Sequence, residues 1–161
     1  MQILVYGYGN PGRQDDGLGV ELVQRLEEWA AQSGLKNLAF ENNYQLNIED
    51  AEAISHQDLV FFADASEEDI KDFCLSEVDG KAKLSFTTHA ASPGYIVKLC
   101  RELFQKNPHV WLLHIKGYEW DFREGISKRG MQNLEKALDY MKGLLAQPEV
   151  AIESKGKLKL C

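Results

Sequence analysis

Carboxylates and one imidazole that could share a ligand follow three separate apolar stretches of the chain. Asp15 and Asp16 close a glycine-rich segment, residues 7–17, Asp64 comes directly after an apolar run, and His89 precedes a serine–proline pair. Two carboxylates and an imidazole suit a borderline divalent metal such as nickel or zinc. Asp16, Asp64 and His89 are therefore the candidate metal-binding and catalytic residues, with their individual roles open.

The adjacent aspartates also have a simpler explanation. One acidic side chain in the first turn of a helix interacts favourably with the helix dipole, by about 0.3–1 kcal/mol. Two in series at the end of the first strand favour a ligand role for one of them, and whether Asp15 assists Asp16 stays open. Asp64 could serve as a turn residue, but a carboxylate that ends an apolar strand is costly unless it is exposed or paired.

The elements that must position these residues alternate between strands and helices. Apolar runs predict strands at 3–6, 38–40, 59–63 and 110–115, with weaker candidates at 75–78 and 84–86. Helical patterns predict helices at 18–30 and 48–54, the latter with Asn47 as a cap, and two more that begin after Ser92 and Ser127. We expect one α/β domain over residues 1–147 and a loose, polar C-terminal tail over residues 148–161.

This alternation predicts a three-layer α/β/α sandwich, with a mostly parallel, twisted central sheet and helices on both faces. Ligands of such sheets bind outside the carboxyl ends of the strands. The segments after Tyr6, Ala63 and Ile115 and the loop around His89 all reach that edge. Because each of these residues follows the carboxyl end of a predicted strand, we expect Asp16, Asp64 and His89 to meet there.

The glycine spacing Gly7-x-Gly9-x-x-Gly12 also matches a dinucleotide-binding fingerprint, but the carboxylates argue against that function. A true fingerprint runs directly into its helix, so that the helix N-terminus meets the pyrophosphate. Here five residues intervene, and two carboxylates would repel a pyrophosphate by a few kcal/mol, at an effective dielectric constant of about 20. We interpret the glycines instead as a tight turn that lets Asp16 reach the sheet edge.

Composition excludes several other classes. The 161 residues carry a net charge of −7, which disfavours nucleic-acid and anionic-membrane partners. The three cysteines, Cys74, Cys100 and Cys161, indicate neither a disulfide framework nor a zinc site, so a reducing cytoplasm is expected. There is no secretory-signal pattern and no run long enough to span a membrane. No serine-nucleophile elbow or HExxH motif appears. His114 lies inside a predicted strand, and we interpret it as a core or edge residue rather than a ligand.

Taken together, these segments resemble the nickel–iron hydrogenase maturation endopeptidases, which remove a C-terminal extension from the hydrogenase large subunit after nickel insertion. The resemblance covers most of the chain in order. Its matching pieces are residues 3–10, Arg13 to Gly19, Phe61 to Ala65, Thr88 to Pro93, Gly117 to Phe122 and Gly125 to Ser127.

The resemblance implies the same three site residues, since that family binds metal at the positions of Asp16, Asp64 and His89. It implies an aspartyl-type endopeptidase that recognises nickel supplied by its substrate, a hydrogenase large-subunit precursor as partner, and the three-layer fold. We expect a monomer. The open alternatives are a docking module that contacts the nickel site without cutting and, third, a nucleotide-binding domain.

One segment departs from the family pattern. Better-known members carry an Asp-Gly-Gly-Thr type of loop after the second strand, where this chain has Glu41 to Leu46. We interpret the departure as a different branch with another partner hydrogenase, a divergent specificity or an altered activity. The opening also resembles that of peptidyl-tRNA hydrolases, which need a basic tRNA-binding face that a net charge of −7 does not provide.

Overall fold

A computed structural model describes residues 1–81 and 91–161. Within these residues, five strands form one sheet in the order β2-β1-β3-β5-β4. Four strands are parallel, β1 (Ile3–Tyr8), β2 (Leu38–Asn43), β3 (Leu59–Ser66) and β5 (His109–Lys116), and β4 (Phe73–Glu77) runs antiparallel to β5.

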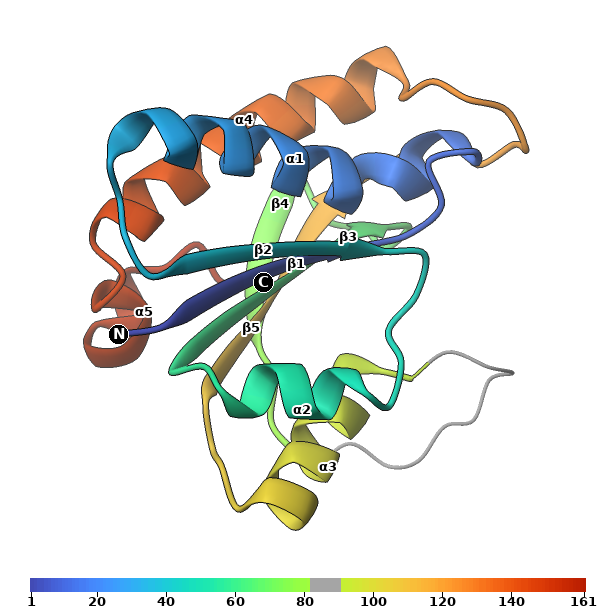
Figure 1. Ribbon diagram of the computed structural model, residues 1–161. Coiled ribbons are helices and arrows are strands. Elements are labelled where there is room, and N and C mark those ends of the chain that lie inside the picture. The colour runs from blue at the N-terminus through green and yellow to red at the C-terminus, as the bar shows by residue number, and fades with distance from the viewer. Residues whose placement is uncertain (82–90) are drawn as a thin grey trace.

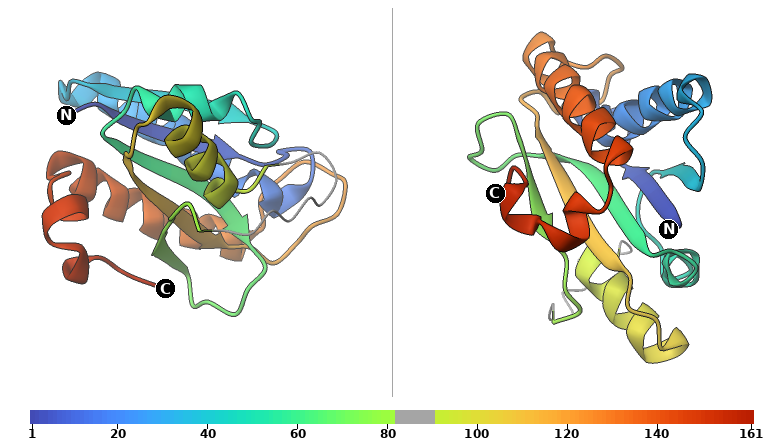
Figure 2. Two further views of the ribbon diagram at one scale, coloured as in Figure 1. Left: turned by 90° about the horizontal axis from the view of Figure 1, so that it is seen from below. Right: turned by 90° about the vertical axis from the view of Figure 1, so that its left-hand side faces the viewer.

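Helices cover both faces of this sheet (Figure 1). α1 (Leu18–Ser33) and α4 (Lys128–Ala146) lie on one face, and α2 (Asp50–Ser55) and α3 (Pro93–Phe104) lie on the other, as the side views of Figure 2 also show. The short helix α5 (Val150–Glu153) follows α4. The predicted α/β/α sandwich is therefore confirmed.

The apolar residues of the strands alternate between two cores, because successive side chains of a strand point to opposite faces. Val5, Phe61 and Trp111 contribute to the larger core, under α1 and α4. Leu4 and Phe62 contribute to the smaller core, under α2 and α3. Both sets are buried, which explains why strands β1 and β3 read as continuous apolar runs.

Several predicted boundaries shift. β3 extends to Ser66, so Asp64 lies inside the strand rather than after it. The second helix begins at Asp50, and Asn47 does not cap it. The N-cap position is Glu49, without a side-chain capping bond, and the Asn47 N–H donates to Asp50 Oδ2 at 2.8 Å. The predicted strand 84–86 lies outside the described residues.

The C-terminal segment is not a loose tail, which corrects the prediction for residues 148–161. Ala151 is fully buried, and its carbonyl accepts a hydrogen bond from Trp111 Nε1 at 3.1 Å. A disulfide joins Cys161 to Cys74 on β4, which corrects the expectation of no disulfide. Among the described residues, no helix is both long enough and apolar enough to cross a membrane.

Candidate functional site

A tight turn and a 3-10 helix, η1 (Gln14–Gly17), carry Asp16 from the end of β1 to the start of α1. Gly9 has a φ of +137°, and a Cβ built on it would lie 2.0 Å from the Asp16 carbonyl oxygen. The backbone at Gly9 therefore requires glycine. The Asn10 N–H donates to Asp16 Oδ2 at 2.8 Å, which fixes the carboxylate against the turn. The glycines thus shape a turn that presents Asp16.

A second glycine seats α1 directly on the end of β3. A Cβ on Gly19 would lie 2.2 Å from the Ala63 carbonyl oxygen, so the first turn of α1 touches the strand backbone just before Asp64. The close approach brings η1 and the end of β3 together. The structure therefore places Asp16 and Asp64 at the same edge of the sheet.

Asp64 titrates far from the usual range of an aspartate. Burial, and then the charge of Asp16, raise the pKa of Asp64 to about 7, against the opposing effects of hydrogen bonds from the Tyr8 hydroxyl and the Ala65 backbone. Burial and the neighbouring Asp64 carboxylate also raise the pKa of Tyr8. The Asp64 carboxyl is therefore within the electrostatic influence of Asp16, at the edge of the sheet that the Gly19 contact brings to η1. Sequence reasoning missed Tyr8, although its place as the last residue of β1 was a signal.

Asp15 has a different role from Asp16. Its side chain is fully buried and points to the loop between β5 and α4. Its carboxylate accepts hydrogen bonds from the backbone N–H groups of Tyr118 (2.7 Å), Glu119 (3.1 Å) and Ser127 (2.7 Å), and from Ser127 Oγ (2.7 Å). Since its oxygens are occupied in this way, Asp15 holds the loop rather than a ligand.

Neither of the two discussed histidines completes the site within the described residues. His89 lies outside them. His114 is the Cα partner of Asp64 in the β3–β5 register, but its Nε2 is hydrogen-bonded to Ser76 Oγ at 2.7 Å, and burial lowers its pKa. Over residues 1–81 and 91–161, no group of three or more His, Cys, Asp and Glu side chains is placed to hold a metal ion. Two carboxylates offer part of a hard-oxygen donor set, and the imidazole stays a prediction.

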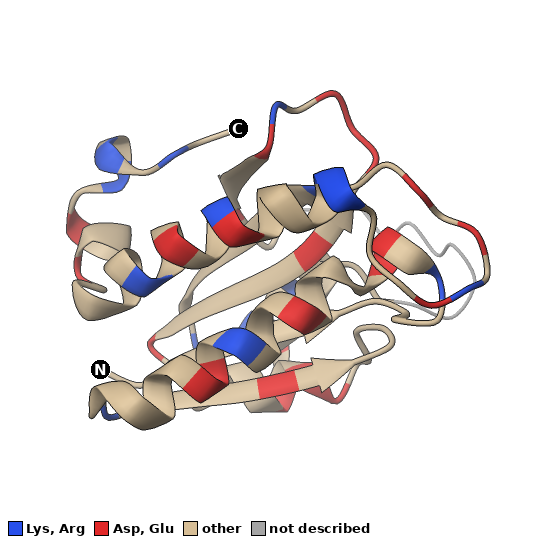
Figure 3. Cartoon of the chain, turned by 90° about the horizontal axis from the view of Figure 1, so that it is seen from above, with Lys and Arg blue, Asp and Glu red and all other residues tan. Residues whose placement is uncertain are grey.

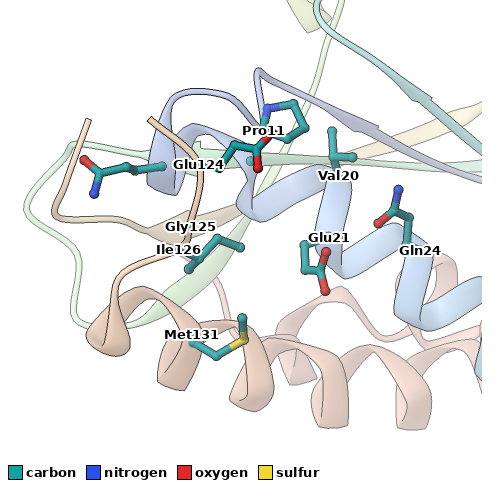
Figure 4. Close-up of a pocket in the computed structure, with 10 residues that line it drawn as sticks. Pro11, Val20, Glu21, Gln24, Glu124, Gly125, Ile126 and Met131 are labelled. Carbon is teal, nitrogen blue, oxygen red and sulfur yellow. The ribbon is translucent and has the colours of Figure 1, made fainter. Parts of the chain in front are cut away.

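The loop from Gly117 to Ser127 packs on the same turn and bounds a cavity beside it. Gln14 holds this loop at Asp121, whose N–H donates to Gln14 Oε1 at 2.9 Å, and Arg13 lies over the rings of Trp120 and Phe122. The cavity, of about 350 Å³, lies between Pro11, α1 and the start of α4, as Figure 4 shows. The carboxylates of Asp16 and Asp64 do not line it, so it adjoins the candidate site without containing it.

Solved structures that share this fold include several hydrogenase maturation proteases. The chain matches the [NiFe] hydrogenase maturation protease HycI from Thermococcus kodakarensis KOD1 with a TM-score of 0.72 and 21% identity, over 90% of this chain and 92% of that one. It matches the hydrogenase maturating endopeptidase HybD from E. coli with a TM-score of 0.72 and 17% identity, over 92% of this chain and 94% of that one.

A hydrogenase 2 maturation peptidase from a Thaumarchaeota archaeon matches with a TM-score of 0.64 and 17% identity, over 90% of this chain and 98% of that one. No family model and no curated protein matches the sequence. At 17–21% identity, the similarity to these solved structures establishes the fold of this chain but not its activity.

Proposed function

We propose that this protein is a processing endopeptidase that removes the C-terminal extension of a nickel–iron hydrogenase large-subunit precursor after nickel insertion. The observation that carries the proposal is the joint placement of Asp16 and Asp64 at the carboxyl edge of the sheet, in a fold whose solved examples include hydrogenase maturation proteases. Among the described residues, two segments that resemble this family in sequence, Arg13 to Gly19 and Phe61 to Ala65, carry the two carboxylates.

In this proposal the nickel ion belongs to the substrate. Asp16 and Asp64 contact it through carboxylate oxygens, and His89 contributes an imidazole nitrogen. A nickel ion held there would recruit the precursor and supply Lewis-acid polarisation of the scissile carbonyl. The chain's own residues orient this contact, because Asn10 fixes the Asp16 carboxylate and Tyr8 holds the Asp64 carboxylate. Cleavage would then wait for nickel insertion.

The experiment combines the purified protein with nickel-loaded and nickel-free precursor and follows loss of the C-terminal extension by mass spectrometry. We expect cleavage of the nickel-loaded precursor alone. Asp16→Asn, Asp64→Asn and His89→Ala should each lower the rate by at least about 100-fold, the scale of a lost catalytic group. Asp69→Asn is the matched control, since it removes the same charge from an exposed loop.

Two outcomes would overturn parts of the proposal. Binding of the nickel-loaded precursor without cleavage would instead identify a docking module. Cleavage that persists in both Asp16→Asn and His89→Ala would disprove the assigned roles.

Location and oligomeric state belong to the same proposal. The expectation of a reducing compartment was based on cysteines without partners, and the Cys74–Cys161 disulfide removes that argument. We propose a cytoplasmic monomer from the expected partner, a precursor that is processed where nickel is inserted. Cell fractionation and size-exclusion chromatography test the two statements separately.

A further inference from the structure

The two edge strands of the sheet, β4 and β2, differ in whether another segment of the chain pairs with their outer edge. The outer edge of β4 is covered by the chain's own C-terminal segment. The Leu75 N–H donates to the Lys159 carbonyl at 2.8 Å, the Cys161 N–H donates to the Leu75 carbonyl at 2.9 Å, and the disulfide from Cys74 to Cys161 holds the segment in place. An exposed row of backbone groups at a sheet edge can pair with a strand of another chain. At Leu75, the C-terminal segment already occupies these groups of β4.

Over residues 1–81 and 91–161, no strand pairs with the outer edge of β2. The Ile3 N–H donates to the Asn37 carbonyl and the Gly9 N–H donates to the Asn43 carbonyl, at 2.9 and 3.1 Å. In a parallel ladder, the backbone groups of every second residue bond to the neighbouring strand. Since the carbonyls of residues 37 and 43 accept bonds from Ile3 and Gly9, the backbone groups of the odd-numbered residues of β2 face β1. The backbone N–H and C=O groups of 38, 40 and 42 therefore face away from the sheet, at the last strand in its order.

Of the usual protections of an edge strand, β2 carries one charged side chain, that of Glu41. Proteins usually blunt edge strands with lysine, proline, a bulge or a covering segment. The strand Leu38–Asn43 contains neither lysine nor proline, and its register with β1 is unbroken over all six residues. Most of its side chains are exposed. An edge left open in this way, on a chain whose other edge is covered, points to a partner strand.

The open edge leads to the candidate site. At the carboxyl end of β2, a hollow of about 220 Å³ lies between Asn42, Asn43, Tyr44, Gly9, Pro11 and Val20. Tyr44 is 71% exposed and forms an outer wall. The opposite wall includes Gly9, which packs against the backbone of Asp16. A strand added to β2 and continued past Asn42 would enter this hollow and arrive beside Asp16.

The charge around the edge selects a basic occupant. Residues 18–55, which form α1, β2 and α2, contain seven acidic and two basic residues. Asp50 is buried and accepts a hydrogen bond from the Tyr6 hydroxyl, and the other six acidic residues of this range are not buried. Arg25, one of the two basic residues, is paired with Glu21 at 3.0 Å. Figure 3 shows acidic residues on both α1 and β2. Lysine or arginine side chains of an added strand would meet this field.

We propose that the open edge of β2 and the hollow beside Tyr44 bind an extended, basic segment of the substrate polypeptide as an added β-strand. Backbone hydrogen bonds to residues 38, 40 and 42 supply the affinity, and acidic residues such as Glu41 select for basic side chains. This inference rests on the proposed function in one respect, the identity of the substrate as the hydrogenase precursor.

Short peptides test the surface without the precursor. The probe is a fluorescent octapeptide of alternating valine and lysine, and its control alternates valine and glutamate. We expect the basic probe to bind, with an affinity that falls as salt rises, and the acidic one not to. Two N-methylated forms of the basic probe, modified on its odd-numbered or its even-numbered residues, cover the two possible registers. The form that lacks the N–H groups facing β2 should bind about tenfold more weakly, the scale of one to two hydrogen bonds.

Variants of the protein test the same surface against the precursor. Asn42→Pro removes an outward N–H without touching the ladder to β1, and Asn42→Ala is its matched control. We expect Asn42→Pro and Glu41→Lys to raise the KM for the precursor by about three- to tenfold with little change in kcat, while Asn42→Ala stays near wild type. Circular dichroism checks that each variant is folded, and the N-methylated probe decides the question if Asn42→Pro is not.

The outcomes separate this inference from the proposed function. Binding of the basic probe that N-methylation abolishes, without any precursor cleavage, would keep the docking edge and overturn the endopeptidase. Precursor cleavage with an unchanged KM in Asn42→Pro and Glu41→Lys, or equal binding of the N-methylated and unmodified probes, would overturn the docking edge.

Discussion

Replacing Asp15 by alanine should destabilise the whole domain, whereas the same change at the neighbouring Asp16 should remove activity at little cost in stability. The two aspartates are adjacent in sequence and differ in what their carboxylates contact. Asp15 accepts four hydrogen bonds from the loop between β5 and α4, and Asp16 accepts one from Asn10.

The magnitude follows from these contacts. Asp15→Ala removes a fully buried carboxylate and leaves four part-buried donors without their acceptor. An orphaned buried donor costs about 1–3 kcal/mol, and water that enters the vacated space offsets part of the sum. We expect a loss of about 3–5 kcal/mol in the free energy of unfolding, and under about 1 kcal/mol for Asp16→Ala, which loses one partly exposed bond.

The assay is urea unfolding followed by far-ultraviolet circular dichroism, with thermal unfolding as a second measure. For a domain of this size each kcal/mol lowers Tm by about 2–4 °C, so Asp15→Ala should melt about 6–20 °C below wild type. Asp15→Asn separates charge from shape, because its single amide oxygen retains part of the acceptor set. Ser127→Ala removes one donor with its acceptor left in place, and should cost less than Asp15→Ala.

A loss below about 1 kcal/mol in Asp15→Ala would refute the reasoning, since it would mean that water replaces the carboxylate at all four donors at almost no cost. Equal destabilisation by Asp16→Ala would refute the division of roles between the two residues.

Three further predictions concern other parts of the molecule. Because the pKa of Asp64 is higher in the folded protein, at about 7, than its ordinary 3.8, the unfolded chain releases this proton first, and the carboxyl lowers stability progressively between about pH 4 and 7. In the metal-free protein, Asp64→Asn should therefore raise Tm at pH 8 and change it little at pH 4, and an equal rise at both values would contradict this. His114→Ala should leave precursor cleavage within about threefold of wild type while His89→Ala abolishes it, because the His114 ring is bonded to the edge strand; the reverse order would exchange their roles. The Cys74–Cys161 disulfide joins residues 87 apart, and its reduction should lower the free energy of unfolding by about 2–4 kcal/mol. Urea titrations with and without dithiothreitol measure this difference. Coincident titrations would show that the bond adds no stability.

The sheet and the place of Asp16 could be predicted because both depend on local patterns. Apolar runs such as 59–63 predict buried strands, and strand ends of a parallel sheet meet at one edge. Gly9 signals a turn in the sequence because its required φ is rare for other residues. These features need only a short window of sequence.

Other features depend on contacts far along the chain, which no local pattern contains. The partners of Asp15 lie 103 to 112 residues away. The C-terminal segment reads as polar, but Ala151 and Leu158 are buried against the larger core. The cysteine pairing joins two elements that are adjacent in space alone. The role of Asp15, the packed C-terminal segment and the disulfide were therefore unresolved or wrongly predicted.

The division of the apolar residues into two unequal cores has a consequence for the order in which the protein opens. The layer of α2 and α3 is held by the smaller core, so it should undergo sub-global unfolding at a lower free energy than the layer of α1 and α4. Native-state amide hydrogen exchange would show this as less protection in α2 and α3. Asp16 is carried by the slowly exchanging layer, whereas Tyr8 packs against the faster one. Tyr8, on the central strand β1, therefore borders the layer that should open first, and Asp16 belongs to the layer that should open last.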